Sequence, residues 1–153
     1  MEWQRDNFFI STEKSRLDIS YIHRFLSQES YWAEQIPMEI VARSVENSLC
    51  FGIYHNEQQV GFARIITDEA TFGYLADVFI DQSFRGRGLS KWLMQVIMEF
   101  PSLQGLRRLL LATKDAHGLY EQFGFSVVKN SERFMNIHRP DVYKCNGPIS
   151  QSS

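Results

Sequence analysis

Cysteine is scarce in this sequence, and its spacing supports neither a disulfide framework nor a metal site. Only Cys50 and Cys145 occur, and neither lies in a CxxC motif or in a cluster with histidine. Two isolated thiols are too few for a disulfide scaffold, and they lack the ligand spacing of a zinc site. We therefore expect reduced structural thiols, a cytoplasmic location and no metal.

Excess charge of either sign and long apolar runs are also missing. The formal net charge is −2, which gives no general attraction to nucleic acid or to anionic lipid. No stretch approaches the ~18 apolar residues of a membrane-spanning helix, and the first residues lack the basic and apolar regions of a signal peptide. Nucleic-acid binding, membrane insertion and export are therefore not expected.

The composition that remains is that of an ordinary globular protein. The 153 residues are 44% hydrophobic and 22% charged, and one domain commonly spans ~100–200 residues. We expect a single domain over residues 1–153, with its core at about 8–144 and a flexible polar tail at 146–153. The sequence leaves open whether the chain is a monomer or a homodimer.

The spacing of apolar residues predicts alternating strands and helices. Strands are expected at 8–11, 49–55, 59–67, 71–80, 106–113, 125–128 and 133–138. Helices are expected at 19–26, 37–45, 89–100 and 115–123. This order indicates an α/β (α+β) fold with a mixed, mostly antiparallel sheet of about six or seven strands. The step from 71–80 through a helix to 106–113 predicts a central, right-handed, parallel β-α-β crossover.

One predicted strand leads through Arg85-Gly86-Arg87-Gly88 directly into an amphipathic helix. Glycine lets the backbone approach a ligand, and helix amides, helix dipole and arginines together favour a phosphate. A P-loop would need a Lys-Ser or Lys-Thr pair that is absent, and a dinucleotide fingerprint would need glycine where Lys91 stands. The alternative to a phosphate site is a tight turn whose arginines are exposed to solvent. We favour a pyrophosphate site.

The loop from Ser83 to Gly88, SFRGRG, resembles the signature of the GNAT superfamily of N-acetyltransferases. That signature is Gln or Arg, two residues, Gly, one residue, then Gly or Ala; Ser83 departs from it at the first position. The resemblance implies acetyl-CoA as cosubstrate, its pyrophosphate on the loop amides and its pantetheine chain beside the preceding strand. The cofactor-binding residues so implied are Val78, Phe79, Ile80, Arg85, Gly86, Arg87, Gly88, Leu89 and Ser90.

A second segment supports the resemblance. Residues 116–125, AHGLYEQFGF, are similar to the family motif in which Ala and a Leu-Tyr pair precede Gly-Phe, although Thr113 stands where many members have Asn. The likeness runs from Phe8 to about Lys144 and implies the GNAT fold, with helices on both faces of the sheet. The closing ERFMNIHRPDVY looks like a feature of an uncharacterised bacterial subgroup and identifies no acceptor.

The resemblance makes Tyr120 the proton donor to the departing thiolate. Its alternative role is core packing, because Tyr120 shares a helical face with Ala116, Leu119 and Phe123. A phenol of pKa ~10 is a weaker acid than a thiol of ~8.5, so full transfer is uphill by roughly 2 kcal/mol. We therefore expect Tyr120 to act mainly by a hydrogen bond.

The sequence says less about the residues that would bind the acceptor than about those that would bind the cosubstrate. Asp77, on the strand that should line the cleft, is a candidate general base, with an ordinary solvated carboxylate as the alternative. Tyr31 and Trp32 lie where the family places a substrate-covering loop, and Asp68 could hold a cationic substrate; core packing and solvated charge are the respective alternatives. The histidines show no ligand spacing, and Cys145 lacks a base that could activate it.

These observations predict an acyltransferase that moves acetyl from acetyl-CoA to a primary amine of a small molecule or peptide. With no candidate for a covalent intermediate, the amine should attack the thioester directly in a ternary complex. The alternative function is a non-catalytic acyl-CoA-binding or interaction module that keeps the phosphate loop.

Overall fold

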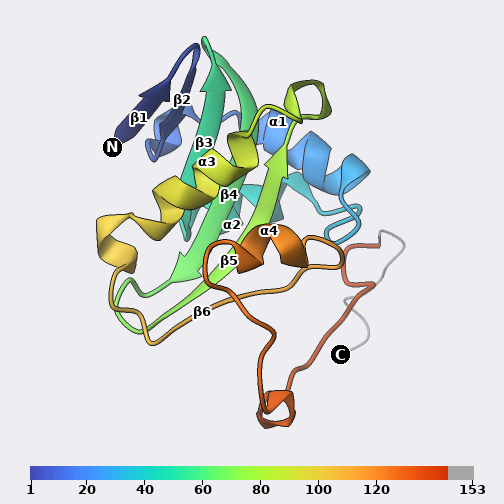
Figure 1. The fold of residues 1–153 in the computed structure, drawn as a ribbon. Helices are drawn as coiled ribbons and strands as arrows, with labels where there is room; N and C mark the ends of the chain where they lie inside the picture. The colour runs from blue at the N-terminus through green and yellow to red at the C-terminus, as the bar shows by residue number, and fades with distance from the viewer. Residues whose placement is uncertain (145–153) are drawn as a thin grey trace.

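The computed structural model describes residues 1–144 and has one sheet at its centre (Figure 1). Its strand order follows the sequence, and all neighbours are antiparallel except β5 and β6, which are parallel. The strands are β1 (Glu2–Arg5), β2 (Phe8–Ser11), β3 (Leu49–His55), β4 (Gln58–Thr67), β5 (Phe72–Ile80) and β6 (Arg108–Leu111). The mixed, mostly antiparallel sheet is therefore confirmed, whereas the expected tail at 146–153 and Cys145 lie outside the described residues.

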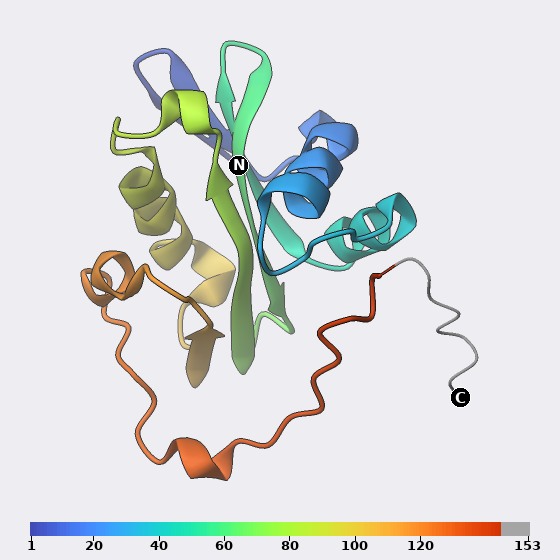
Figure 2. The same ribbon diagram turned by 90° about the vertical axis from the view of Figure 1, so that its right-hand side faces the viewer.

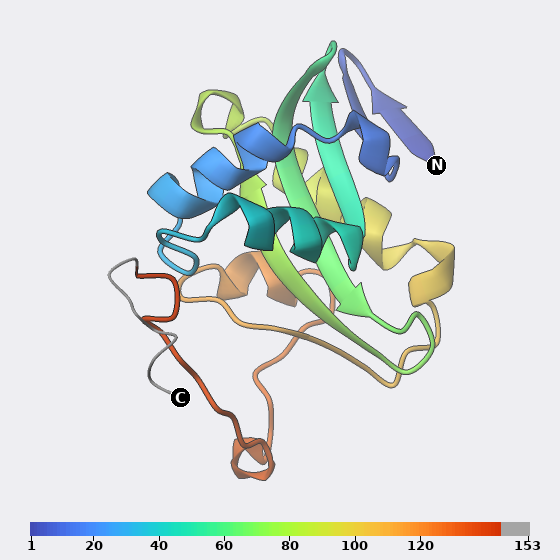
Figure 3. The ribbon, with the colours of Figure 1, turned by 180° about the vertical axis from the view of Figure 1, so that it is seen from behind.

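Helices cover both faces of the sheet (Figures 2 and 3). On one face lie α1 (Ile19–Arg24), its π-helical continuation η2 (Phe25–Glu29) and α2 (Met38–Glu46). On the other lie α3 (Leu89–Met98) and the short α4 (His117–Glu121). None of the helices within residues 1–144 is long and apolar enough to cross a membrane.

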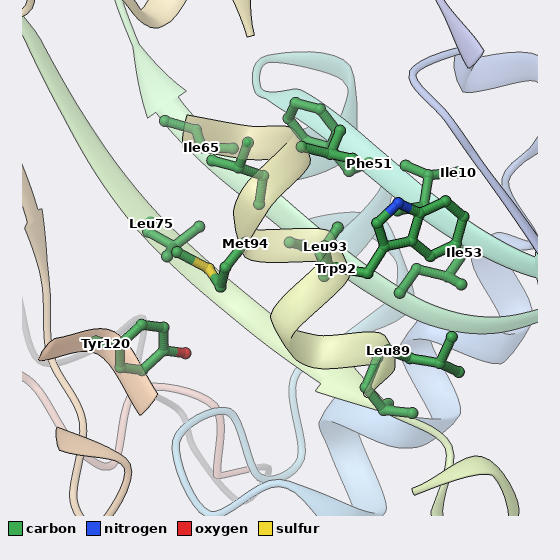
Figure 4. Packing of buried hydrophobic residues seen from close by; sticks show 14 of the residues in the cluster. Ile10, Phe51, Ile53, Ile65, Leu75, Leu89, Trp92, Leu93, Met94 and Tyr120 are labelled. Atoms are coloured by element: carbon green, nitrogen blue, oxygen red, sulfur yellow. The ribbon is translucent and has the colours of Figure 1, made fainter. Parts of the chain in front are cut away.

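Two apolar clusters hold these layers together. One lies between the sheet and α3 and includes Phe51, Ile53, Leu93 and Met94 (Figure 4). The other joins the opposite face of the sheet to α1 and α2, where the rings of Phe25 and Phe79 stack at 3.8 Å between centroids. Because apolar side chains point to both faces of β3, β4 and β5, these strands are buried on both sides and form a rigid frame for the site.

The first strand was missed by the sequence analysis. The run EWQR in β1 is short and mostly polar, so it lacks the alternation that marks a strand. It pairs with β2, and Trp3 packs near the rings of Phe51 and Phe100. The sheet therefore begins before residue 8, where the first strand was expected.

The two last expected strands, at 125–128 and 133–138, are wrong for the chain as described. Neither segment pairs with a strand within residues 1–144, and only the 3-10 turn η5 (Ser131–Arg133) interrupts their irregular course. Their composition suits a strand, but a strand forms only where a partner edge meets it. As a result, β6 is an edge strand, and the parallel β5-α3-β6 crossover lies at the border of the sheet rather than at its centre.

Candidate active site

The sheet opens where β5 and β6 part. Their parallel pairing covers only Phe72–Leu75 and Arg108–Leu111, while β5 continues beside β4 to Ile80. A cleft of about 610 Å³ lies at this divergence, with residues 74–78 on one side and residues 111–116 on the other. Ligands of open α/β sheets commonly bind at such a point, beyond the carboxyl ends of parallel strands.

A bulge at Asp77 shapes the β5 wall. The register shifts between Phe62 and Arg64 of β4, so that one residue there faces two on β5. Asp77 has a φ of +56°, a left-handed conformation that is uncommon outside glycine. A bulge bends its strand and removes local ladder partners. The edge of β5 beyond the bulge can therefore offer backbone groups to an extended ligand.

Three residues of this wall were expected to contact the cofactor. Phe79 is buried in the cluster with α1 and α2, and Ile80 is buried in the cluster with α3, so their side chains face opposite sides of the sheet. Val78 is half-buried and lines the cleft. Phe79 and Ile80 can therefore meet a ligand only through their backbone groups.

The expected phosphate loop follows β5 directly. The 3-10 turn η3 (Gln82–Phe84) leads into it, and α3 begins at Leu89. Gly86 and Gly88 have φ values of +79° and +77°, which explains why both positions are glycine. A Cβ at either position would meet no atom within 4 Å. The space in front of the loop is thus open to a ligand.

The first turn of α3 is suited to an anion. Its N-cap is Gly88, which provides no side-chain hydrogen bond to the helix. The first amides of a helix have no partner within the helix, and the helix dipole adds positive potential there. Leu89 is buried and Ser90 is half-buried, so their contribution to binding would come from backbone N–H groups. These features fit the pyrophosphate of a coenzyme.

Both arginines of the glycine loop make contacts within the loop or with the end of β5. Nε of Arg85 donates to the carbonyl oxygen of Ile80 at 3.0 Å, which ties the loop to the end of β5. The guanidinium of Arg87 lies 5.1 Å from the ring centroid of Phe84. Each guanidinium carries five N–H donors, so donors remain for a phosphate.

Tyr120 lies where two cavities meet. It lines the β5–β6 cleft and also a second groove beyond β6, and its ring packs 5.9 Å from that of Phe125. Burial raises the pKa of Tyr120 above its ordinary value, and Tyr31 adds to the effect. The hydroxyl is thus an even weaker acid than an exposed tyrosine, which favours hydrogen bonding over complete proton transfer.

Asp77 is held in an ion pair. Its Oδ2 accepts from Nε of Arg64 at 2.6 Å, and its Oδ1 accepts from Nε1 of Trp32 at 2.7 Å. Only 8% of the Asp77 side chain is exposed, and Arg64 also donates to Ser48 at 3.0 Å. Asp77 does line the cleft as predicted, but its charge is balanced by Arg64 rather than free.

The predicted substrate loop spans the mouth of the cleft. Trp32 is tied to β5 through Asp77, while the hydroxyl of Tyr31 accepts from the backbone N–H of Lys114 at 3.2 Å. The two rings meet edge to face with centroids 5.1 Å apart. The loop is therefore anchored to both walls, and both aromatic side chains line the space between them.

Asp68, the third expected substrate residue, does not line the cleft. Its Oδ1 accepts from the N–H groups of Ala70, Thr71 and Phe72, and its Oδ2 accepts from the Thr71 hydroxyl. The Thr71 hydrogen bonds, followed by those from the other amides, lower the pKa of Asp68. The structure thus shows a turn-forming residue between β4 and β5, where the sequence had suggested a substrate contact.

Several further cleft residues were missed by the sequence analysis, and among them are four polar or charged side chains that could contact a ligand. These four come from two strands and from the end of the described chain, and are Arg64, Tyr74, His138 and Tyr143. The β4–β5 hairpin could have indicated Arg64, because cross-strand neighbours of a candidate acid often pair with it. No sequence pattern predicts that residues 138 and 143 return to the cleft, because that return depends on an irregular segment.

Comparison with known proteins agrees with this geometry. The model of the Acetyltransferase (GNAT) family matches residues 6–125. A protein of Gibberella zeae named "Putative acetyltransferase FG08082" is 33% identical over 172 residues, which cover 97% of this chain and 94% of that protein.

Solved structures give the same result. A GNAT-family protein of Xanthomonas campestris pv. campestris is 50% identical and has a TM-score of 0.88 over 90% of this chain and 96% of its own. A predicted acetyltransferase of Clostridium acetobutylicum, determined with acetyl-CoA, shares the fold at 13% identity, with a TM-score of 0.63 over 90% of this chain and 96% of its own. The diverging strands and the glycine loop are consistent with the family of these relatives. The chain belongs to the GNAT family of acetyltransferases.

Proposed function

We propose that this protein transfers an acetyl group from acetyl-CoA to a primary amine of a small molecule or peptide. The proposal rests mainly on one observation: the edge of β5 leads directly into the open glycine loop, and the loop leads into the start of α3, which has no side-chain cap. A coenzyme A thioester has an extended chain and a pyrophosphate, which suit a strand edge and a helix N-terminus in that order. The acetyl-CoA-bound relative of the same fold supports this choice of cosubstrate.

The amine would approach through the cleft below Tyr31 and Trp32. Its nitrogen attacks the thioester carbonyl carbon, a C–N bond forms, the C–S bond breaks and the sulfur leaves as a thiolate. Tyr120 donates a hydrogen bond to that sulfur, in keeping with its place at the cleft and its raised pKa. Such a hydrogen bond acts mainly as charge develops, so it favours the transition state over the bound substrate.

Removal of the amine proton is the second requirement. An alkylammonium of pKa ~10.4 is neutral in about one molecule in 2,500 at pH 7, a cost of roughly 4.6 kcal/mol. Asp77 is our candidate acceptor of that proton, directly or through a water molecule. Its pairing with Arg64 and Trp32 fixes its orientation in the cleft wall, as a positioned base requires.

An acceptor screen tests the function. Purified protein is mixed with acetyl-CoA and a panel of alkylamines, arylamines and peptides, and released thiol is measured. We expect amine-dependent release of one thiol for each acetylated amine found by mass spectrometry. Saturable acetyl-CoA binding without amine-dependent release across the panel would support the alternative, a non-catalytic acyl-CoA-binding module.

A further inference from the structure

Aromatic side chains are concentrated in the β5–β6 cleft. Of the nineteen residues within 1–144 that line it, five are tyrosine or tryptophan, whereas aromatic residues make up 14% of the chain. They are Tyr31, Trp32, Tyr74, Tyr120 and Tyr143. Small-molecule sites are typically lined by apolar and aromatic side chains, with a few polar groups that fix the orientation of the ligand. The rings of the lining therefore indicate the kind of acceptor that the cleft binds.

Three of these rings lie on the α1/α2 face of the sheet. Tyr74 precedes Leu75 on β5, and Leu75 belongs to the cluster with α3, so Tyr74 points to the opposite face. Tyr143 packs against the cluster formed by α1 and α2; it belongs to residues 130–144, which we call the C-terminal arm and which return near α2 (Figure 2). Trp32 lies in the loop between η2 and α2. An acceptor that enters opposite α3 thus meets three rings.

Two of the three rings have no aromatic partner of their own. Tyr31 meets Trp32 edge to face, and the ammonium of Lys114 lies 5.3 Å from the centroid of the Tyr31 ring. By contrast, neither Tyr74 nor Tyr143 forms an aromatic pair within residues 1–144. Both are half-buried. Offset or edge-to-face contact between rings adds to the apolar area that they bury, so these two rings leave that interaction to a ligand.

The charges in the cleft are balanced. Within residues 1–144, Arg64 and Asp77 are the only charged lining residues that are not exposed, and their side chains pair at 2.6 Å. Lys114 and Asp115 also line the cleft but are exposed, so solvent and salt screen their charges. A carboxylate or a second ammonium on the acceptor would lose hydration inside the cleft without gaining an unpaired opposite charge. Amino acids and polyamines are therefore disfavoured, and the rings remain the main feature for recognition.

We propose that the acceptor is an arylalkylamine: a primary amine on a short chain that carries an aromatic ring and no further charge. This inference rests on the proposed function. The aromatic ring lies between Trp32, Tyr74 and Tyr143, and the amine lies between Asp77 and Tyr120. The ammonium gives one proton to Asp77, directly or through water, and its nitrogen then forms the C–N bond as the C–S bond breaks. The second proton that the nitrogen loses ends on the sulfur of coenzyme A, so the products are a neutral amide and a thiol.

A matched series of acceptors tests this class. The measurement is kcat/KM from thiol release at saturating acetyl-CoA for 2-phenylethylamine, 2-cyclohexylethylamine, phenylalanine and spermidine. We expect the value for 2-phenylethylamine to exceed that for 2-cyclohexylethylamine, which has the same reach but no π system, by about 3- to 10-fold. It should exceed the values for phenylalanine and spermidine by at least about 100-fold, because each brings an uncompensated charge into the cleft. An equal or higher value for any of the other three amines would overturn the proposal.

A variant of β5 locates the bound ring. Tyr74→Leu keeps an apolar side chain but removes the aromatic ring, so the ratio of kcat/KM between 2-phenylethylamine and 2-cyclohexylethylamine should fall toward one. Phe9→Leu is the matched control, because Phe9 is also half-buried and stacks on the ring of Tyr54 at 4.8 Å between centroids, outside the cleft. This control should keep the wild-type ratio. An unchanged ratio in Tyr74→Leu, or an equal fall in Phe9→Leu, would contradict the placement of the ring.

Binding without turnover separates this inference from the proposed function. Calorimetry in the presence of coenzyme A measures the affinity for each amine when no acetyl group can be transferred. Tighter binding of 2-phenylethylamine than of 2-cyclohexylethylamine, without thiol release from acetyl-CoA, would support the ring site and contradict acetyl transfer. Thiol release with other amines, but no preference for the aromatic ring in either assay, would support acetyl transfer and contradict the ring site.

Discussion

The two walls of the β5–β6 cleft are built differently. The β5 wall is a long strand paired with β4, bulged at Asp77 and continuous with the glycine loop and α3. The β6 wall is a four-residue edge strand with half-buried leucines, followed by the five-residue α4 and an exposed arm. The first wall leads into the glycine loop whose sequence resembles the family signature, and the second collects residues from distant segments. This difference explains why the sequence and the structure support a proposal about the cosubstrate more strongly than one about the acceptor.

The largest expected effect tests the chemistry of the β5 wall. Asp77→Asn should keep the shape of the side chain and an oxygen for Trp32, but it removes the base and the partner of Arg64. If Asp77 accepts the amine proton, turnover should fall by about 10²–10⁴-fold with little change in acetyl-CoA affinity. The deficit should shrink as the pH approaches the pKa of the amine, and a neutral arylamine should be affected least.

Asp68→Asn is the matched control for that variant. The same change in the β4–β5 turn leaves an oxygen that can still accept from backbone N–H groups, so turnover should stay near the wild-type value. If Asp77→Asn instead loses the same factor at every pH and with every amine, Asp77 positions the wall and another group takes the proton.

The next effect concerns the loop at the end of β5. Gly88→Asp forces a side chain onto a φ of +77° and places a negative charge where the pyrophosphate should bind. Acetyl-CoA affinity measured by calorimetry should fall by at least about 100-fold. Gly105→Asp, at a φ of +83° with equally open surroundings but outside the loop, should carry the same backbone strain without the loss of affinity. Equal acetyl-CoA affinities for the two variants would show that the pyrophosphate does not bind at the start of α3.

Tyr120→Phe probes the meeting point of the two walls. Loss of the hydroxyl should lower kcat by about 10- to 100-fold and leave acetyl-CoA affinity nearly unchanged, since the hydrogen bond strengthens only as sulfur departs. Tyr54→Phe is a suitable control, because Tyr54 is also buried and its hydroxyl has no hydrogen-bond partner within residues 1–144. Wild-type turnover in Tyr120→Phe would mean that Tyr120 contributes only to core packing.

The sequence predicted the β5 wall far better than the β6 wall, for a physical reason. The glycines, the helix period of 89–98 and the buried runs of β3 to β5 are local patterns, and local geometry follows from them. The role of Asp77 in an ion pair depends on β4, and the bulge that orients it leaves no mark on the residue types. The absent strands at 125–128 and 133–138 show the same limit, because strand formation depends on a partner edge that local propensity does not reveal.

The smallest expected effect tests whether the loop with Tyr31 and Trp32 joins the two walls. Trp32→Phe keeps a ring in the cleft but removes the hydrogen bond to Asp77, whereas Tyr31→Phe removes only the contact with the backbone of Lys114. A hydrogen bond to a charged group contributes about 1.5–3 kcal/mol at most when buried and less when exposed; here Trp32 is 43% exposed. We therefore expect Trp32→Phe to raise the acceptor KM by about 3- to 10-fold, with Tyr31→Phe affected less and acetyl-CoA affinity unchanged in both. A fall in kcat with an unchanged KM in Trp32→Phe would instead show that Trp32 orients Asp77 for proton transfer. The loop would then contribute to the chemistry at the β5 wall rather than to substrate binding.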